Sequence, residues 1–224
     1  MNLAKSYEYF NPLNCKGRCH IIGCGSVGST VAENLARLGI TKFTLYDFDV
    51  VEPHNIANQM FVNDDIGKEK VDAVAEIITS INPDAKKDIR IQRKGYTNQV
   101  LNGYVFLCVD NIDTRREIVE ASKDNRSIKA MFDFRTRLED SQHYAADWSN
   151  PTDIEKLLGQ MQFTHEEAKE ATPVSACNVE LCVAPTVRMV CSVGVANFMN
   201  FINEKPLHKT VLIDSFNLWI DAYK

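Results

Sequence analysis

Short apolar runs alternate with helical patterns along the first 135 residues of the chain. Five of the runs have the length of strands and cover residues 19–22, 43–46, 89–91, 104–109 and 130–134, and a sixth follows at 142–146. Between them, apolar residues at helical spacing predict helices over 29–38, 71–81 and 113–122. The alternation predicts an α/β fold with a Rossmann-like, mostly parallel sheet flanked by helices.

The pattern changes after Trp148. The stretch of about 148–176 is mostly polar and holds one helix-like piece, near 164–171. We interpret it as a crossover loop, because a long connection inside a compact domain is usually functional or mobile. An apolar helix at 185–202 and two short apolar runs, 211–213 and 218–220, predict a final helix and two C-terminal closing strands. We expect a single domain over residues 1–224.

Composition excludes several classes of function. The chain has 224 residues, 45% hydrophobic and 25% charged, with a net charge of −5. No basic block indicates nucleic acid binding, and no apolar stretch reaches the roughly 20 residues that span a membrane. The seven cysteines form no CxxC pair. This favours reduced thiols in a cytoplasm and argues against a zinc site built from CxxC knuckles.

The most informative motif follows the first apolar run. Gly23-Cys24-Gly25-Ser26-Val27-Gly28 joins that run to the first predicted helix. In such turns the first glycine permits the bend, the second lets the backbone approach a ligand, and the third lets helix and strand come close. The free N–H groups of the helix then face an anion. The motif predicts nucleotide binding; the alternative is a glycine turn kept only for close packing.

Further polar residues lie at the ends of the predicted strands, where open α/β sheets bind ligands. Asp47 and Asp49 follow the second run, and Asp47 suits a ribose hydroxyl. Asp110 and Asn111 follow the fourth long run. Asp110 is a hard oxygen donor suited to Mg²⁺, or alternatively a helix N-cap. Lys70, at the start of a predicted helix, could reach a phosphate or be a solvated surface lysine.

The segment after the second strand favours adenylate chemistry over hydride transfer. It contains Asn55, Asn58 and Gln59 and leads into Lys70. A dehydrogenase would use the same glycine turn and acidic residue, but it has no need for a polar collar and a lysine beside the phosphates. An NAD-dependent oxidoreductase nevertheless remains an alternative.

These motifs occur in an order that resembles the ThiF/MoeB/HesA superfamily of ubiquitin-activating-type adenylyltransferases. The resemblance runs from about residue 18 to residue 203. It rests on Gly23-x-Gly25-x-x-Gly28, Asp47-Phe48-Asp49-Val50-Val51, Asn55-x-x-Asn58-Gln59, Gly67-x-x-Lys70, Ile81-Asn82-Pro83, Val109-Asp110-Asn111, Arg137-Leu138-Glu139 and Cys177-x-x-x-x-Cys182-Val183-Ala184-Pro185.

The resemblance implies an enzyme that uses ATP and Mg²⁺ to adenylate a C-terminal carboxylate. The substrate would be a small ubiquitin-like or sulfur-carrier protein, or a peptide, with a C-terminal glycine. By position, Asp47 would bind ribose, Asn55 and Lys70 the phosphates, and Asp110 the magnesium. The residues expected to bind nucleotide and metal are Gly23, Gly25, Ser26, Val27, Gly28, Asp47, Asp49, Asn55, Asn58, Gln59, Lys70, Asp110 and Asn111.

Catalysis would fall to Asp110 and Lys70, with Cys177 as a further candidate. Cys177 aligns with a cysteine that forms a thioester or acyl disulfide in some relatives, and its alternative is a small buried hydrophobe. Arg135 and Arg137 could supply positive charge or orient the incoming tail, or instead form salt bridges with Glu139 or Asp140. The resemblance also implies a homodimer through the sheet domain, to which the helix over 186–202 could contribute.

The chain departs from the family pattern at Asn58, where relatives commonly have arginine, and it lacks the two zinc knuckles and the N-terminal basic motif of many members. A nucleotide-binding module without turnover is therefore a second hypothesis. Activation of a carboxylate on a modified tRNA base is a third, which the acidic net charge disfavours.

Overall fold

The computed structural model describes residues 1–174 and 181–224. Its centre is one eight-stranded sheet in the order β3-β2-β1-β4-β5-β6-β7-β8. The parallel strands are β1 (Cys19–Ile22), β2 (Phe43–Tyr46), β3 (Ile89–Gln92), β4 (Gly103–Leu107) and β5 (Ile128–Thr136). Three antiparallel strands extend the sheet, namely β6 (Asp140–Asp147), β7 (Thr210–Asp214) and β8 (Trp219–Tyr223).

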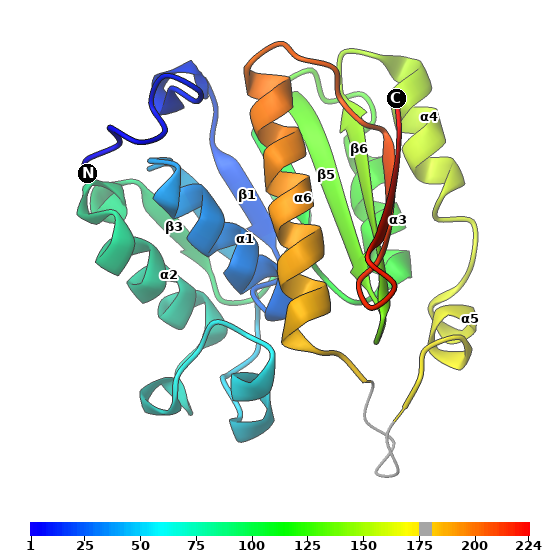
Figure 1. Ribbon diagram of the computed structural model, residues 1–224, viewed down its shortest axis with the longest axis horizontal. Helices are drawn as coiled ribbons and strands as arrows, with labels where there is room; N and C mark the ends of the chain where they lie inside the picture. Colours follow the sequence, from blue (N-terminus) through cyan, green and yellow to red (C-terminus); the bar gives the residue numbers. More distant parts are fainter. Residues whose placement is uncertain (175–180) are drawn as a thin grey trace.

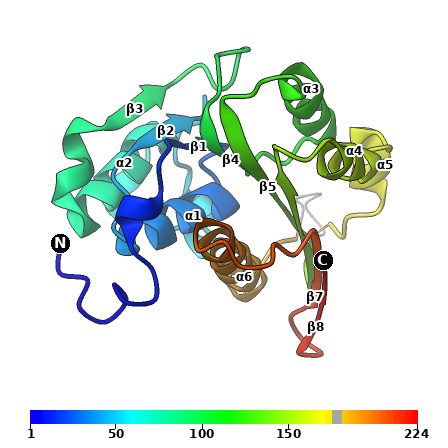
Figure 2. The same cartoon turned by 90° about the horizontal axis from the view of Figure 1, so that it is seen from above.

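Helices cover both faces of this sheet, as Figures 1 and 2 show. One face carries α1 (Ser26–Arg37), α2 (Lys70–Ile81) and α6 (Ala184–Ile202), and the other carries α3 (Ile112–Ser122), α4 (Pro151–Gly159) and α5 (His165–Glu170). Short 3-10 helices are η1 (Pro12–Asn14), η2 (Pro53–Ala57), η3 (Asn63–Asp65) and η4 (Pro83–Lys87). The α/β architecture predicted from the alternating pattern is confirmed.

Two apolar cores lie on the two faces of the sheet. Every residue of β1, β2 and β4 is buried, because helices exclude water from both faces of these strands. This explains why the runs in the sequence are continuously apolar rather than alternating. No helix of the described residues is both long enough and apolar enough to cross a membrane.

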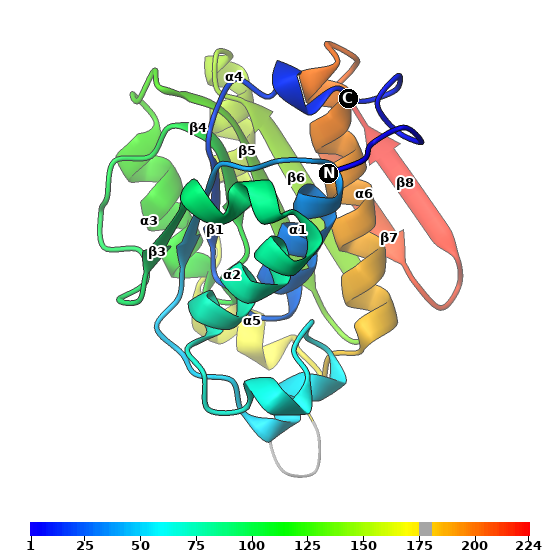
Figure 3. The same cartoon turned by 90° about the vertical axis from the view of Figure 1, so that its left-hand side faces the viewer.

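The two ends of the parallel strands lie in different surroundings. The carboxyl ends of the five parallel strands lie together, next to η2, η3 and α5, at the bottom of Figure 1. Both chain termini lie at the opposite end, as Figure 3 also shows. The strand order reverses between β1 and β4, and ligands bind outside the carboxyl ends of strands at such a switch point.

Three details of the sequence interpretation were wrong. The polar stretch contains α4 as well as α5, because Asn150 caps α4 through a bond from the Thr152 N–H and Ile154 and Leu157 are buried. The first helix begins at Ser26, directly on the glycine turn, and not at residue 29. Leu218 is not in a strand but has a left-handed φ of 57° in the turn before β8.

Candidate functional site

The glycine turn has different steric demands at each of its three glycines. Gly23 has a φ of +93°, and a Cβ there would lie 2.7 Å from the Cys108 carbonyl carbon. A Cβ on Gly28 would lie 1.8 Å from the Gly23 carbonyl oxygen, so helix and turn need this glycine to come close. A Cβ on Gly25 would meet nothing within 4 Å. Gly23 and Gly28 are thus required by the fold, whereas Gly25 borders open space at the start of α1 and leaves room for an anion.

The acidic residues after β2 are fixed by backbone donors. Asp47 Oδ2 accepts a hydrogen bond from the Cys24 N–H at 2.6 Å, and Asp47 Oδ1 accepts one from the Asp49 N–H at 2.9 Å. Burial raises the pKa of Asp47, although these two N–H groups act in the opposite direction. Asp47 is therefore held beside the glycine turn, and its binding of ribose stays a prediction.

Lys70 forms an ion pair with Asp49, with 2.7 Å between Nζ and Oδ2. The Lys70 side chain is 11% exposed, while that of Asp49 is 49% exposed. Lys70 lies at the first position of α2 and does not line the pocket described below. In this structure the ammonium group of Lys70 is therefore paired with Asp49.

A pocket of about 700 Å³ lies at the carboxyl edge of the sheet. The start of α1, η2, the β4–α3 loop, the β5–β6 turn and α5 form its walls. Of the residues predicted from the sequence, it brings together Ser26, Val27, Asn55, Asn58, Gln59 and Asp110. It also includes Arg135, Arg137 and Cys182.

One wall of the pocket carries the three amides. Asn55 Oδ1 accepts from the Glu52 N–H at 2.9 Å, which leaves its NH₂ group as a donor. Asn58 donates from Nδ2 to the Cys182 carbonyl over 3.5 Å. The side-chain oxygen of Gln59 is buried with no hydrogen-bond partner. An unpaired buried polar atom that lines a pocket fits a site for a polar ligand.

Asp110 and Asn111 have separate roles at the start of α3. Asn111 is the N-cap, and its Oδ1 accepts from the Thr114 N–H at 3.0 Å. Asp110 is exposed at the pocket, and its side chain makes no hydrogen bond or ion pair with the described residues. The alternative that Asp110 caps the helix is therefore wrong. Its free carboxylate fits a magnesium ligand.

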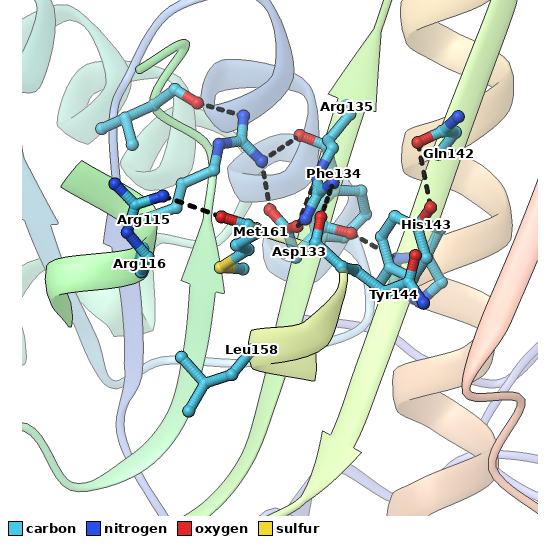
Figure 4. A network of polar contacts seen from close by, with 12 residues as sticks. Arg115, Arg116, Asp133, Phe134, Arg135, Gln142, His143, Tyr144, Leu158 and Met161 are labelled. Atoms are coloured by element: carbon cyan, nitrogen blue, oxygen red, sulfur yellow. Dashed lines mark hydrogen bonds and ion pairs between the residues drawn. The ribbon is translucent and has the colours of Figure 1, made fainter. Parts of the chain in front are cut away.

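An ion cluster around the buried Asp133 borders the pocket, because its two arginines, Arg115 and Arg135, line it, and Figure 4 shows its contacts. Arg115 bonds to the Asp133 carboxylate and to the Phe134 carbonyl, and Arg135 bonds to Asp133 through Nε at 2.8 Å. Burial raises the pKa of the fully buried Asp133, but the two guanidinium groups outweigh it and the net pKa is lowered. The two arginines share one carboxylate, so the cluster keeps one positive charge.

The two candidate arginines differ, since Arg135 lies in β5 and Arg137 follows it. Arg135 is committed to Asp133, donates to the Gln160 carbonyl at 2.7 Å and lies over the Tyr144 ring at 4.6 Å. The Arg137 side chain is exposed and has no ion pair or hydrogen bond with the described residues. The expected alternative of salt bridges with Glu139 or Asp140 is therefore wrong for both.

The structure bears on other cysteines but not on the candidate nucleophile. Cys177 lies outside the described residues. Burial raises the pKa of the Cys24, Cys108 and Cys191 thiols, which disfavours the reactive thiolate at those three positions. The described residues contain no group of three or more His, Cys, Asp or Glu side chains that could bind a metal ion.

Sequence reasoning missed the Arg115–Asp133–Arg135 cluster and the contribution of α5 to the pocket. The signal for the cluster was an acidic residue inside an otherwise apolar strand, which requires a cationic partner when buried. The helix near 164–171 was predicted, and the capping box of Thr164 and Glu167 begins it, but no local signal in the sequence places it at the pocket.

Comparison with known proteins defines the family. The chain matches the ThiF family over residues 14–218. The protein therefore belongs to the ThiF family.

Two curated relatives carry the same name. Ubiquitin-like modifier-activating enzyme 5 of Drosophila persimilis is 32% identical over an alignment of 144 residues, and the match covers 55% of this chain and 35% of that protein. Ubiquitin-like modifier-activating enzyme 5 of Dictyostelium discoideum is 32% identical over an alignment of 137 residues, and the match covers 54% of this chain and 35% of that protein. The chain thus spans about a third of the length of these relatives.

Solved structures share the fold at lower identity. The crystal structure of PaaA has a TM-score of 0.70 and 17% identity, and the match covers 97% of this chain and 66% of that one. Escherichia coli MccB with ATP has a TM-score of 0.65 and 18% identity, and the match covers 95% of this chain and 65% of that one. Escherichia coli MccB with AMPCPP and MccA has a TM-score of 0.68 and 18% identity, and the match covers 100% of this chain and 72% of that one.

Proposed function

We propose that the protein is an ATP-dependent adenylyltransferase that activates a C-terminal carboxylate, as in the ubiquitin-like-modifier-activating type. The observation that carries this proposal is the shared sheet edge. The open space at Gly25, the fixed carboxylate of Asp47 and the free carboxylate of Asp110 follow three neighbouring strands, β1, β2 and β4. Membership of the ThiF family and the names of the relatives support it.

The reaction would join a carboxylate oxygen to the α-phosphorus of ATP. The bond from that phosphorus to the bridging oxygen breaks, and pyrophosphate leaves with the electron pair. The products are an acyl adenylate and pyrophosphate. Because negative charge is concentrated on phosphate oxygens, the reaction needs donors and cations around them. The N–H groups at the start of α1 and the NH₂ group of Asn55 would provide donors.

The residues present fit Mg²⁺ at one position. Asp110 would bind it, since Mg²⁺ in nucleotide sites commonly takes one or two protein carboxylates together with phosphate oxygens. Bound Mg²⁺ would supply neutralisation of phosphate charge. Lys70 would act on phosphate only after exchanging its ion pair with Asp49 for a phosphate oxygen. Function without a structural zinc remains part of the proposal.

Calorimetry distinguishes the nucleotide classes. We expect the protein to bind ATP with Mg²⁺ and to bind NAD at least tenfold more weakly, a difference of about 1.4 kcal/mol. Tight NAD binding without ATP binding would replace the proposal with an oxidoreductase.

A second candidate function is a nucleotide-binding module without turnover. The observation that favours it is Asn58, whose amide is bound to the Cys182 carbonyl and brings no positive charge to the pocket. Asn58→Arg tests this candidate: if the wild type binds ATP without adenylating any carboxylate and the variant gains the reaction, the module hypothesis is correct. Turnover by the wild type contradicts it.

The proposal includes the wider setting of the enzyme. The acyl substrate would be a small ubiquitin-like or sulfur-carrier protein, or a peptide, with a C-terminal glycine, and the enzyme would act in the cytoplasm. Residues 1–224 would form one ThiF-like domain and a homodimer. The exposed apolar side chains of β8, among them Trp219 and Ile220, support an interface, and light scattering that finds a monomer at micromolar concentration would remove it.

A further inference from the structure

Asp110 follows β4, which lies between β1 and β5, and the pocket walls on the two sides of it differ in chemistry. Ser26, Asn55 and Asn58 line the half beside β1 and η2. The other half lies between the β5–β6 turn, which holds Arg137, and α5, which holds Lys169. We call the first the nucleotide half and the second the acyl half.

The geometry of the proposed reaction places a different reactant in each half. Attack at phosphorus proceeds in line, with the incoming oxygen opposite the leaving group. With the phosphates on the glycine turn and the amide wall, the pyrophosphate leaves within the nucleotide half. The carboxylate then has to approach across the acyl half.

The acyl half carries an excess of positive charge in an acidic chain. Arg115 and Arg135 share the single buried carboxylate of Asp133, which leaves one positive charge uncompensated. Arg137 and Lys169 are exposed and have no ion pair with the described residues. Asp140 is the single anionic side chain among the described residues that line this half, although the whole chain has a net charge of −5.

The backbone of the turn that carries Arg137 is held by hydrogen bonds, whereas the Arg137 side chain makes none with the described residues. The Arg137 N–H donates to the Asp140 carbonyl at 2.8 Å, and the Leu138 carbonyl accepts from Thr186 Oγ1 at 2.8 Å. The guanidinium group is thus held near the pocket and is available for a ligand. On α5, His165 Nδ1 is buried with no hydrogen-bond partner, so it can bond to the backbone of an extended tail.

We propose that Arg137 and Lys169 select an acyl substrate whose C-terminal tail carries an acidic side chain close to the terminal carboxylate. This inference rests on the proposed function and adds a substrate class to it. Electrostatic complementarity of this kind sets specificity more than total affinity, because a basic tail would meet like charge in a confined groove.

Sulfamoyl adenosine analogues test the inference by binding alone, because they imitate an acyl adenylate without reacting. Three analogues acylated with N-acetylated Glu-Gly-Gly, Ala-Gly-Gly and Lys-Gly-Gly are compared by calorimetry. We expect the wild type to bind the Glu analogue about fivefold or more tighter than the Ala analogue, and the Lys analogue more weakly still. Added salt should reduce the preference.

Variants assign the preference to the two cations. In Arg137→Ala/Lys169→Ala the three affinities should fall within about twofold of one another, with ATP·Mg²⁺ affinity unchanged. Arg126→Ala is the matched control, since Arg126 is exposed just before the other end of β5 and should leave the preference intact. Equal wild-type affinities for the three analogues, or a preference that survives the double variant, would overturn the inference and leave the proposed function standing. If no analogue binds more tightly than AMP, the proposed function itself fails.

Discussion

Asp110 is the residue at which a substitution should change ligand binding most while changing stability least. Its carboxylate makes no hydrogen bond or ion pair with the described residues, and the neighbouring Asn111 caps α3. Asp110→Asn should therefore leave the free energy of unfolding within about 0.5 kcal/mol of the wild type. Affinity for ATP in the presence of Mg²⁺ should fall about tenfold or more, because the metal loses a charged ligand.

Denaturant unfolding and calorimetry on the same preparation measure both quantities. Asn111→Ala gives the opposite pattern as a control, since losing an N-cap costs about 1 kcal/mol. Equal ATP·Mg²⁺ affinity in folded wild type and Asp110→Asn would show that the metal is bound elsewhere.

The glycine turn offers a matched pair of substitutions. Gly28→Ala should cost about 2 kcal/mol or more of stability, because its Cβ would overlap the Gly23 carbonyl oxygen. Gly25→Ala should fold, since nothing lies within 4 Å of the added Cβ. ATP binding by Gly25→Ala should nevertheless be lost, because the methyl group occupies the space expected for phosphate. Full ATP affinity in this variant would place the phosphates elsewhere.

Some residues of the site could be predicted from their neighbours in the sequence, and others could not because their partners are distant along the chain. Gly23, Gly25 and Gly28 are recognisable in sequence because strand, turn and helix adjoin one another along the chain. The partnership of Arg115 with Asp133 was not predictable, because it depends on how α3 lies against β5. Lys70 was predictable as a cation near the site, but not its pairing with Asp49, since the two residues are 21 positions apart.

At the scale of elements, α6 shows how tertiary packing reverses a local preference. Alanine is favoured over glycine in a helix by about 1 kcal/mol, so Gly194→Ala would stabilise an isolated helix. In the fold, however, the new Cβ would lie 2.1 Å from Phe134 Cε1 and 3.0 Å from His143 Nδ1. Both rings are in the core and cannot move freely. We expect a net loss of about 1–3 kcal/mol in the free energy of unfolding.

Gly159→Ala is the control for Gly194→Ala. Gly159 is the last residue of α4, and an added Cβ there meets nothing within 4 Å. This variant should be neutral or slightly more stable by denaturant unfolding. A Gly194→Ala protein that is as stable as Gly159→Ala would show that α6 is not held against β5 and β6 as described.

Elements with a strong periodic or apolar signal were predictable, and those that depend on context were not. The strands 19–22 and 43–46 were predicted to the residue, because both faces are buried. The helix α4 was not predictable, because its buried residues are few and the segment around it is polar and contains prolines. Pro151 begins that helix rather than breaking it, since the first turn of a helix does not use its N–H groups.

At the scale of the whole molecule, two buried histidines link stability to pH. His143 Nδ1 donates to the Asp133 carbonyl at 3.0 Å, and His20 Nδ1 lies 2.8 Å from the Tyr46 hydroxyl. Burial lowers the pKa of each histidine to about 4. The unfolded chain, with histidine near pKa 6.5, takes up protons that the folded chain cannot.

The free energy of unfolding should therefore fall as pH decreases from about 6.5 to about 4, by on the order of 3 kcal/mol per histidine over the full range. Below about pH 4 the lowered pKa of Asp133 should add a further loss, because protonation removes its charge from between two arginines. Urea titrations at pH 7.5, 5.5 and 4.5 measure the effect. Stability that stays constant between pH 7.5 and 4.5 would contradict the burial of both rings in neutral form.

Pyrophosphate exchange into ATP tests the central claim most directly. Purified protein, Mg²⁺, ATP and labelled pyrophosphate are combined with small carrier proteins and peptides that end in Gly-Gly, each offered with a free carboxylate and as its C-terminal amide. The account predicts that label enters ATP with a free carboxylate and not with the amide, and that Asp110→Asn reduces the rate about tenfold or more. ATP binding without exchange for any free carboxylate would contradict it and identify the protein as a nucleotide-binding module.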